Sequence, residues 1–132
     1  MCYIIFGAIN KEINHEDYEN ALKGSKYTFK IGTKHNVKMC AVNNTYEYRV
    51  TDWVCDCEFP VGNKDEGSVE LKELADLINK LRDARNSKCI YISKTWAGKR
   101  NKSEKNIHIN DIEIIPFLAN MESNCLYKID FH

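Results

Sequence analysis

Hydrophobic residues alternate with polar ones along much of the chain, which is the pattern of half-buried β-strands. The alternation is clearest at residues 27–31, 37–41, 46–50 and 125–131. An apolar run at residues 2–9 predicts a buried strand, and residues 89–93 predict another. The pattern therefore predicts a sheet, into which the strand at 125–131 ties the end of the chain.

Twice the alternation changes parity. The apolar residues of 46–50 and those of 53–59 would face opposite sides of a regular strand. An extra residue near position 51 would keep both sets on the core face, so the sequence predicts one bulged strand here. A second parity change, at position 110, falls inside a strand predicted over 107–115.

One long amphipathic helix is predicted after the polar loop that ends at Gly67. Ser68 is a suitable N-cap, and apolar residues follow at three- and four-residue spacing. This stripe consists of Leu71, Leu74, Ala75, Ile78 and Leu81. Asn14 predicts the N-cap of a short helix closed by Gly24, and residues 116–121 predict a single helical turn.

Runs of strands with one long helix predict an α+β fold. We expect a single domain over residues 1–132, because no repeat and no linker rich in proline, glycine or serine divides the chain. The sheet is expected to be mostly antiparallel, with about six or seven strands and the long helix packed on one face. The strand order does not follow from the sequence.

Composition and charge narrow the function classes. Of 132 residues, 43% are hydrophobic, as in globular domains, and 19 basic side chains balance 19 acidic ones. This zero net charge does not favour nucleic acid as a partner, so any such binding would have to be local. No apolar stretch is long enough for a membrane span, and residues 2–9 lack the flanks of a signal peptide. We expect a cytoplasmic protein, with no membrane partner and reduced thiols. Its lysine, asparagine and isoleucine usage suggests a bacterial or phage origin.

The first candidate site is a Cys-Asp-Cys sequence. In a strand, Cys55 and Cys57 would project from one face, where two thiolates can hold one soft metal ion such as zinc. Cys2, Cys40 or His35 would complete a tetrahedral set. The alternative is a pair of ordinary core thiols, because apolar neighbours at 53 and 59 share their parity. The metal hypothesis predicts a small zinc-stabilised or thiol-dependent protein.

The second candidate site is a basic segment at residues 94–105, expected as a loop between two strands. Its cations would hold an anionic ligand, while the indole would stack on a base, as in sites for nucleotides or nucleic acid. The alternative is a solvated loop. The expected ligand-binding residues are Lys94, Trp96, Lys99, Arg100, Lys102 and Lys105.

Residues 56–83 carry an acidic excess, so the charge of the molecule is expected to be dipolar. Such a dipole would orient the molecule on a partner protein or on a second copy in a homodimer. The alternative is a solvated helix face.

No catalytic motif is present. His108 with Asp111, His15 with Asp17, and Cys2 as a nucleophile are the residues on which an enzyme could be built, but none has a partner at a recognisable spacing. The leading expectation is therefore a small non-enzymatic binding module that takes an anionic ligand or a partner protein through its basic segment. The alternative is the zinc or thiol protein centred on Cys55 and Cys57.

Overall fold

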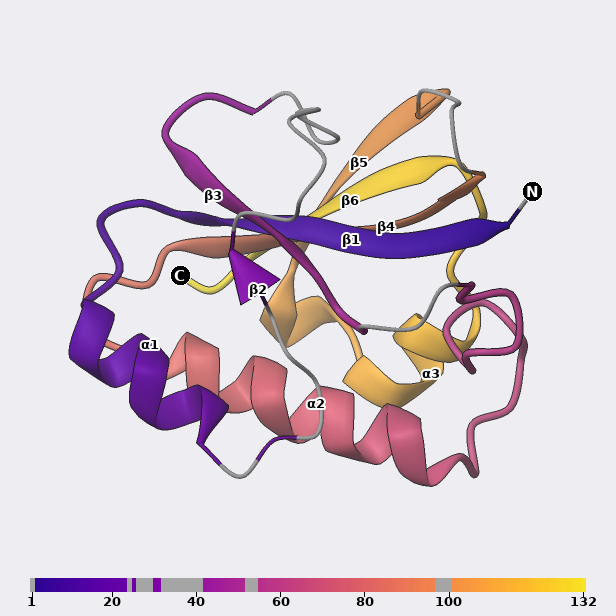
Figure 1. The fold of residues 1–132 in the computed structure, drawn as a ribbon, viewed down its shortest axis with the longest axis horizontal. Helices are drawn as coiled ribbons and strands as arrows, with labels where there is room; N and C mark the ends of the chain where they lie inside the picture. The colour runs from indigo at the N-terminus through magenta and orange to yellow at the C-terminus, as the bar shows by residue number, and fades with distance from the viewer. Residues whose placement is uncertain (1, 24, 26–29, 32–41, 52–54, 97–100) are drawn as a thin grey trace.

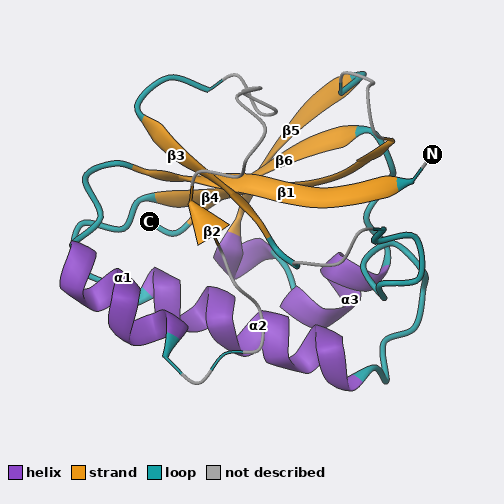
Figure 2. Ribbon diagram, viewed as in Figure 1, coloured by secondary structure: helices purple, strands orange, loops and turns teal. Residues whose placement is uncertain are grey.

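Three helices cover one face of a single twisted sheet in the computed structural model (Figures 1 and 2), which describes residues 2–23, 25, 30–31, 42–51, 55–96 and 101–132. The strands are β1 (Tyr3–Asn10), β2 (Lys30–Ile31), β3 (Thr45–Arg49), β4 (Cys89–Trp96), β5 (Ser103–His108) and β6 (Cys125–Asp130). The helices are α1 (His15–Leu22), α2 (Val69–Arg82) and α3 (Ile114–Ala119), with a 3₁₀ turn, η1, at Ile109–Asp111. The predicted α+β class is confirmed.

The sheet is mixed rather than mostly antiparallel. Its strand order is β2-β3-β1-β4-β6-β5, with β1 paired antiparallel to β3 and β4. At the far edge β5 runs parallel to β6. A parallel pair needs a crossover connection, and here η1 and α3 supply it. The sequence-based expectation of one long helix on the sheet is corrected accordingly, since α1 and α3 accompany α2.

The crossover explains why the strand expected over 107–115 is wrong. At position 110 the chain turns into η1, where the Nδ1 atom of His108 accepts a hydrogen bond from the N–H of Asn110 at 3.1 Å. Ile109 is buried inside this turn and not on a strand. The parity change therefore marks the end of β5, and the expected helical turn at 116–121 corresponds to α3, which begins two residues earlier.

The bulged strand expected over 46–59 is also corrected. β3 ends at Arg49, and residues 57–60 form turns and bends instead of continuing the ladder. Residues 52–54, where the bulge was expected, lie outside the described residues. The burial prediction nevertheless holds for Tyr48, Val50 and Phe59, which all belong to the core. The pattern thus reported which residues are buried, but not the backbone that buries them.

The helical signals are confirmed. Asn14 Oδ1 accepts from the N–H of Asp17 at 3.0 Å, and Ser68 Oγ accepts from the N–H of Leu71 at 3.4 Å. The predicted apolar stripe of α2 is buried throughout against the sheet. Of the strand expected at 27–31, only β2 is described, and the strand expected at 37–41 lies outside the described residues. No helix in the described ranges has the length and apolar character needed to cross a membrane.

At the centre of the sheet, a tyrosine crosses a glycine. Tyr48 of β3 reaches over β1 and donates its hydroxyl hydrogen to the carbonyl oxygen of Tyr91 on β4, at 2.6 Å. The crossing point is Gly7, which pairs with Tyr48. A Cβ atom at Gly7 would lie 1.9 Å from that carbonyl oxygen and 2.3 Å from the tyrosine hydroxyl. Three strands are therefore linked at a place that only glycine fits.

Candidate functional site: a three-thiol cluster at the start of β1

The site forms where the chain leaves β3 and turns beside the first residues of β1. β3 no longer pairs with β1 beyond Arg49, so the polar backbone groups of Tyr3 and Ile5 need other partners. Asp56 supplies two of them: its carboxylate accepts from the N–H of Ile5 at 2.8 Å, and its own N–H donates to the carbonyl of Tyr3 at 3.0 Å. The Cys-Asp-Cys segment is thus fastened to β1 through its central residue.

The Asp56 carboxylate is fully buried and has two further donors. Arg49 forms an ion pair with it at 3.1 Å, and the Thr51 hydroxyl donates to its other oxygen. A buried carboxylate is stable only when it is paired and hydrogen-bonded in this way. Asp56 therefore orients the two neighbouring cysteines, although its own side chain contacts neither sulfur in the contacts described above.

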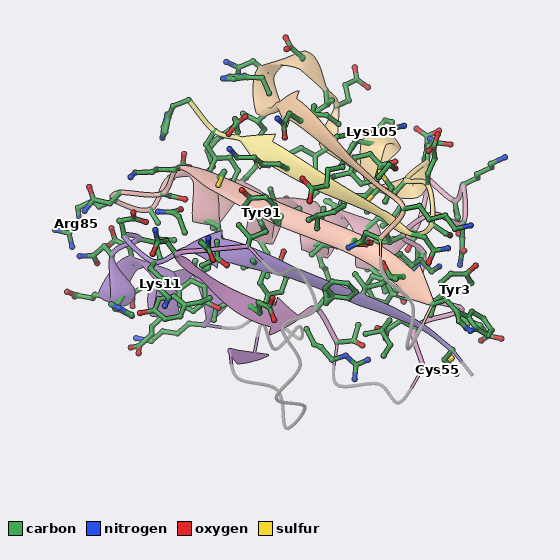
Figure 3. All side chains as sticks on the ribbon, turned by 90° about the horizontal axis from the view of Figure 1, so that it is seen from above. Tyr3, Lys11, Cys55, Arg85, Tyr91 and Lys105 are labelled. Atoms are coloured by element: carbon green, nitrogen blue, oxygen red, sulfur yellow. The ribbon has the colours of Figure 1, made fainter. Side chains whose placement is uncertain are left out.

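Three thiol groups meet at this point. The Sγ atoms of Cys2, Cys55 and Cys57 all lie within 4.8 Å of one another, and those of Cys55 and Cys57 are 3.2 Å apart. The N–H of Tyr3 donates to the Cys57 sulfur at 3.3 Å. All three cysteines are partly buried, so the sulfurs are held in place yet remain reachable from solvent. Figure 3 shows Tyr3 and Cys55 together at one end of the molecule, far from Lys11 and Arg85.

The spacing suits one thiophilic metal ion. Three sulfurs at the usual zinc–sulfur distance of about 2.3 Å, in tetrahedral directions, would lie roughly 3.8 Å from one another. The sulfur separations in the cluster bracket this value. Among the described residues the cluster includes no fourth cysteine, histidine or carboxylate, so the arrangement offers three protein ligands and one open position.

A buried lysine adjoins the cluster. The Lys94 side chain is only 4% exposed, and its ammonium group donates to the carbonyl of Val61 at 2.8 Å and to Asn63 Oδ1 at 3.1 Å. The carbonyls of Phe59 and Cys57 lie at 3.3 and 3.4 Å. Burial lowers the pKa of Lys94, while negative charge on Cys57, Asp56 and Cys55 opposes that shift. The lysine thus gathers the turn that follows the two cysteines.

An aromatic pair stands beside this corner. Trp96 packs edge-on against Tyr3, with ring centroids 5.0 Å apart, and its N–H donates to Asn124 Oδ1 at 3.0 Å. Lys94 lies over the Tyr3 ring, 5.9 Å from the centroid. Trp96 is therefore a packing partner of β1 at the thiol end of the sheet.

The residues of the basic segment are dispersed in the structure. Residues 94–96 belong to β4 and Lys105 belongs to β5, so the loop expected over 94–105 is shorter than predicted. Lys94 points into the protein, whereas Lys105 pairs with Glu122 at 3.2 Å. Lys102 is exposed, and Lys99 and Arg100 lie outside the described residues. The described members do not form one basic surface.

The histidine and aspartate pairs considered for catalysis are engaged elsewhere. His108 caps η1, and Asp17 forms an ion pair with Arg85 at 2.9 Å. The hydrogen bonds from Arg85 lower the pKa of Asp17. Asp111 is exposed at the end of η1. These residues cap and join elements in the structure.

An open polar pocket of about 410 Å³ lies at the opposite end of β4, around Cys89. Its lysines are matched by acids, with Lys128 3.5 Å from Asp130 and Lys88 3.6 Å from Glu12. Because these charges already neutralise one another, the pocket selects no particular ligand charge. It does contain a cysteine remote from the cluster, which serves below as a control.

The sequence identified Cys55 and Cys57 and named Cys2 among three residues that would complete the set. The structure brings Cys2 to them; Cys40 and His35 lie outside the described residues. Sequence reasoning missed the inward direction of Lys94, which it had assigned to the basic loop. The available signal was its position: Lys94 follows Ile90 and Ile92 at a two-residue spacing, on the face of β4 that packs into the core.

A scan of protein-family models, a search of curated proteins and a search of solved structures each found no match to this chain.

Proposed function

We propose that this protein binds one divalent thiophilic metal ion, of which Zn²⁺ is the representative, through Cys2, Cys55 and Cys57. The observation that carries the proposal is the convergence of three thiols from two separate segments to within 4.8 Å. Such an ion would join the start of β1 to the turn after β3, as structural zinc does in small domains. The open fourth position would take water or a ligand from solution.

The proposal includes a reducing compartment, the cytoplasm, because the five cysteines in the described ranges are free thiols. A metal–thiolate site needs its sulfurs unoxidised. The binding of an anionic ligand or a partner protein through the basic segment stays a prediction from the sequence. The metal site is preferred because its ligands are assembled, whereas the described basic residues are not.

The test is metal titration of the reduced, metal-free protein. We expect one Zn²⁺ per chain, measured by competition with a chromophoric chelator, and cobalt–thiolate charge-transfer absorption when Co²⁺ is used instead. Zn²⁺ should also raise the melting temperature, because it binds the folded state. Cys57→Ser should weaken binding by more than about a hundredfold, the upper end of the effect of losing an outer-sphere partner.

Cys89→Ser is the matched control, because Cys89 lies at the other end of β4 and takes no part in the cluster. It should bind the metal as the natural sequence does. Equal loss of binding in Cys57→Ser and Cys89→Ser, or no stoichiometric binding to the natural sequence, would contradict the proposal. The three cysteines would then be ordinary, partly buried thiols.

A further inference from the structure

The corner of the protein that holds the thiols carries one charge without a charged hydrogen-bond partner. In the described part of the chain, the acceptors at the Lys94 ammonium are neutral oxygens, three backbone carbonyls and the Asn63 side chain. The nearby carboxylate of Asp56 is already paired with Arg49. A positive charge that is 4% exposed requires negative charge close by.

The missing negative charge is available from the thiol cluster. Lys94 contacts the backbone of Cys57 and lies close enough to interact electrostatically with Cys55 and Cys57. When a divalent ion displaces three thiol protons, Zn²⁺ + 3 RSH gives Zn(SR)₃⁻ + 3 H⁺, and the complex carries one negative charge. Together with the ammonium group the sum is zero.

We propose that Lys94, given the metal site proposed above, is a specificity-determining residue that makes the three-thiol site selective for a divalent ion. The net charge beside Lys94 is zero only for a divalent ion. A monovalent ion on three thiolates leaves one excess negative charge, and a trivalent centre leaves the ammonium uncompensated. The lysine touches the backbone of a ligand and acts through its charge.

Arsenite is the probe that separates charge from geometry. It condenses with three thiols, As(OH)₃ + 3 RSH giving As(SR)₃ + 3 H₂O, without any change of oxidation state and without net charge on the product. Zn²⁺ and arsenite therefore require the same three sulfurs but differ in what Lys94 contributes. The affinity for arsenite reports whether the thiols are assembled, and the ratio of the two affinities reports the effect of the lysine charge.

The experiment measures both affinities in the full chain, in Lys94→Gln and in Lys94→Arg. Glutamine can still donate to the surrounding carbonyls but is neutral. We expect Lys94→Gln to bind Zn²⁺ at least about tenfold more weakly, the effect of one nearby charge in a partly solvated site, with arsenite affinity unchanged within about threefold. Lys94→Arg should keep the natural ratio. Lys88→Gln, which removes an exposed lysine at the other end of β4, should change neither affinity.

Each remaining outcome is decisive. If Lys94→Gln leaves the ratio unchanged, or weakens both ligands equally, the charge of Lys94 does not set selectivity and the inference is overturned. If Lys94→Gln does not fold, Lys94→Arg decides: a ratio within about threefold of the natural one supports the inference, and a lower ratio overturns it. If the natural sequence binds arsenite but not Zn²⁺, or binds neither, the metal site itself fails.

Discussion

Asp56→Ala is expected to lower the free energy of unfolding by about 3–5 kcal/mol, the cost of breaking a buried ion pair on one side. The alanine leaves the Arg49 guanidinium without its carboxylate and the N–H of Ile5 without its acceptor. Because such a loss is a large fraction of the total stability of a small domain, the variant should be partly unfolded at 37 °C. Urea denaturation followed by circular dichroism measures the effect.

The matched control is Asp83→Ala at the end of α2, where the carboxylate is 74% exposed. It should change stability by less than about 0.5 kcal/mol. Asp56→Asn, which keeps one acceptor oxygen for Ile5, should fall between the two. If Asp56→Ala were as stable as the Asp83 variant, the carboxylate would not fasten the Cys-Asp-Cys segment to β1, and the support for the thiol cluster would be removed.

Gly7→Ala is expected to cost more than about 3 kcal/mol, beyond the usual range for overpacking. The added methyl group would overlap a backbone oxygen of β4, which cannot rotate away, as well as the Tyr48 hydroxyl. Relief requires that β1 and β4 separate or that Tyr48 leave its hydrogen bond, and both changes disturb the centre of the sheet. Thermal and urea unfolding would measure the loss.

Gly67→Ala provides the comparison, because a Cβ there meets only Asp65 Oδ1, at 3.8 Å. It should be neutral within about 0.5 kcal/mol. Tyr48→Phe removes the hydroxyl but keeps the ring, and should cost about 1 kcal/mol, as for a single hydrogen bond. A Gly7→Ala variant as stable as Gly67→Ala would show that the three strands are not held at this crossing.

Local signals in the sequence predicted local structure well. The Asn14 and Ser68 caps, the apolar stripe of α2 and the alternation of β6 each act within a few residues, and each is confirmed. The parallel pairing of β5 and β6 was missed because pairing depends on where the chain returns after η1 and α3. Alternation alone does not distinguish a bulge from the end of a strand, as position 110 shows.

The candidate site was half predictable for the same reason. Cys55 and Cys57 are two residues apart, so their shared chemistry is visible in the sequence. The choice of Cys2 as the third thiol depends on Asp56 bonding to Ile5 across 51 positions of the chain, which no local pattern encodes. Lys94 was misread because its neighbours in sequence are basic, whereas its neighbours in space are carbonyl oxygens.

The strand order also sets an order of events during synthesis. β5 has only one neighbour in the sheet, β6, and β6 follows it in the chain after η1 and α3. A nascent chain leaving the ribosome can therefore form the β3-β1-β4 portion early, while β5 emerges with both edges unpaired. It joins the sheet only after β6 has inserted between it and β4. The last portion of the chain to be translated thus completes the sheet, and a chain stalled before β6 would expose an unpaired strand to aggregation.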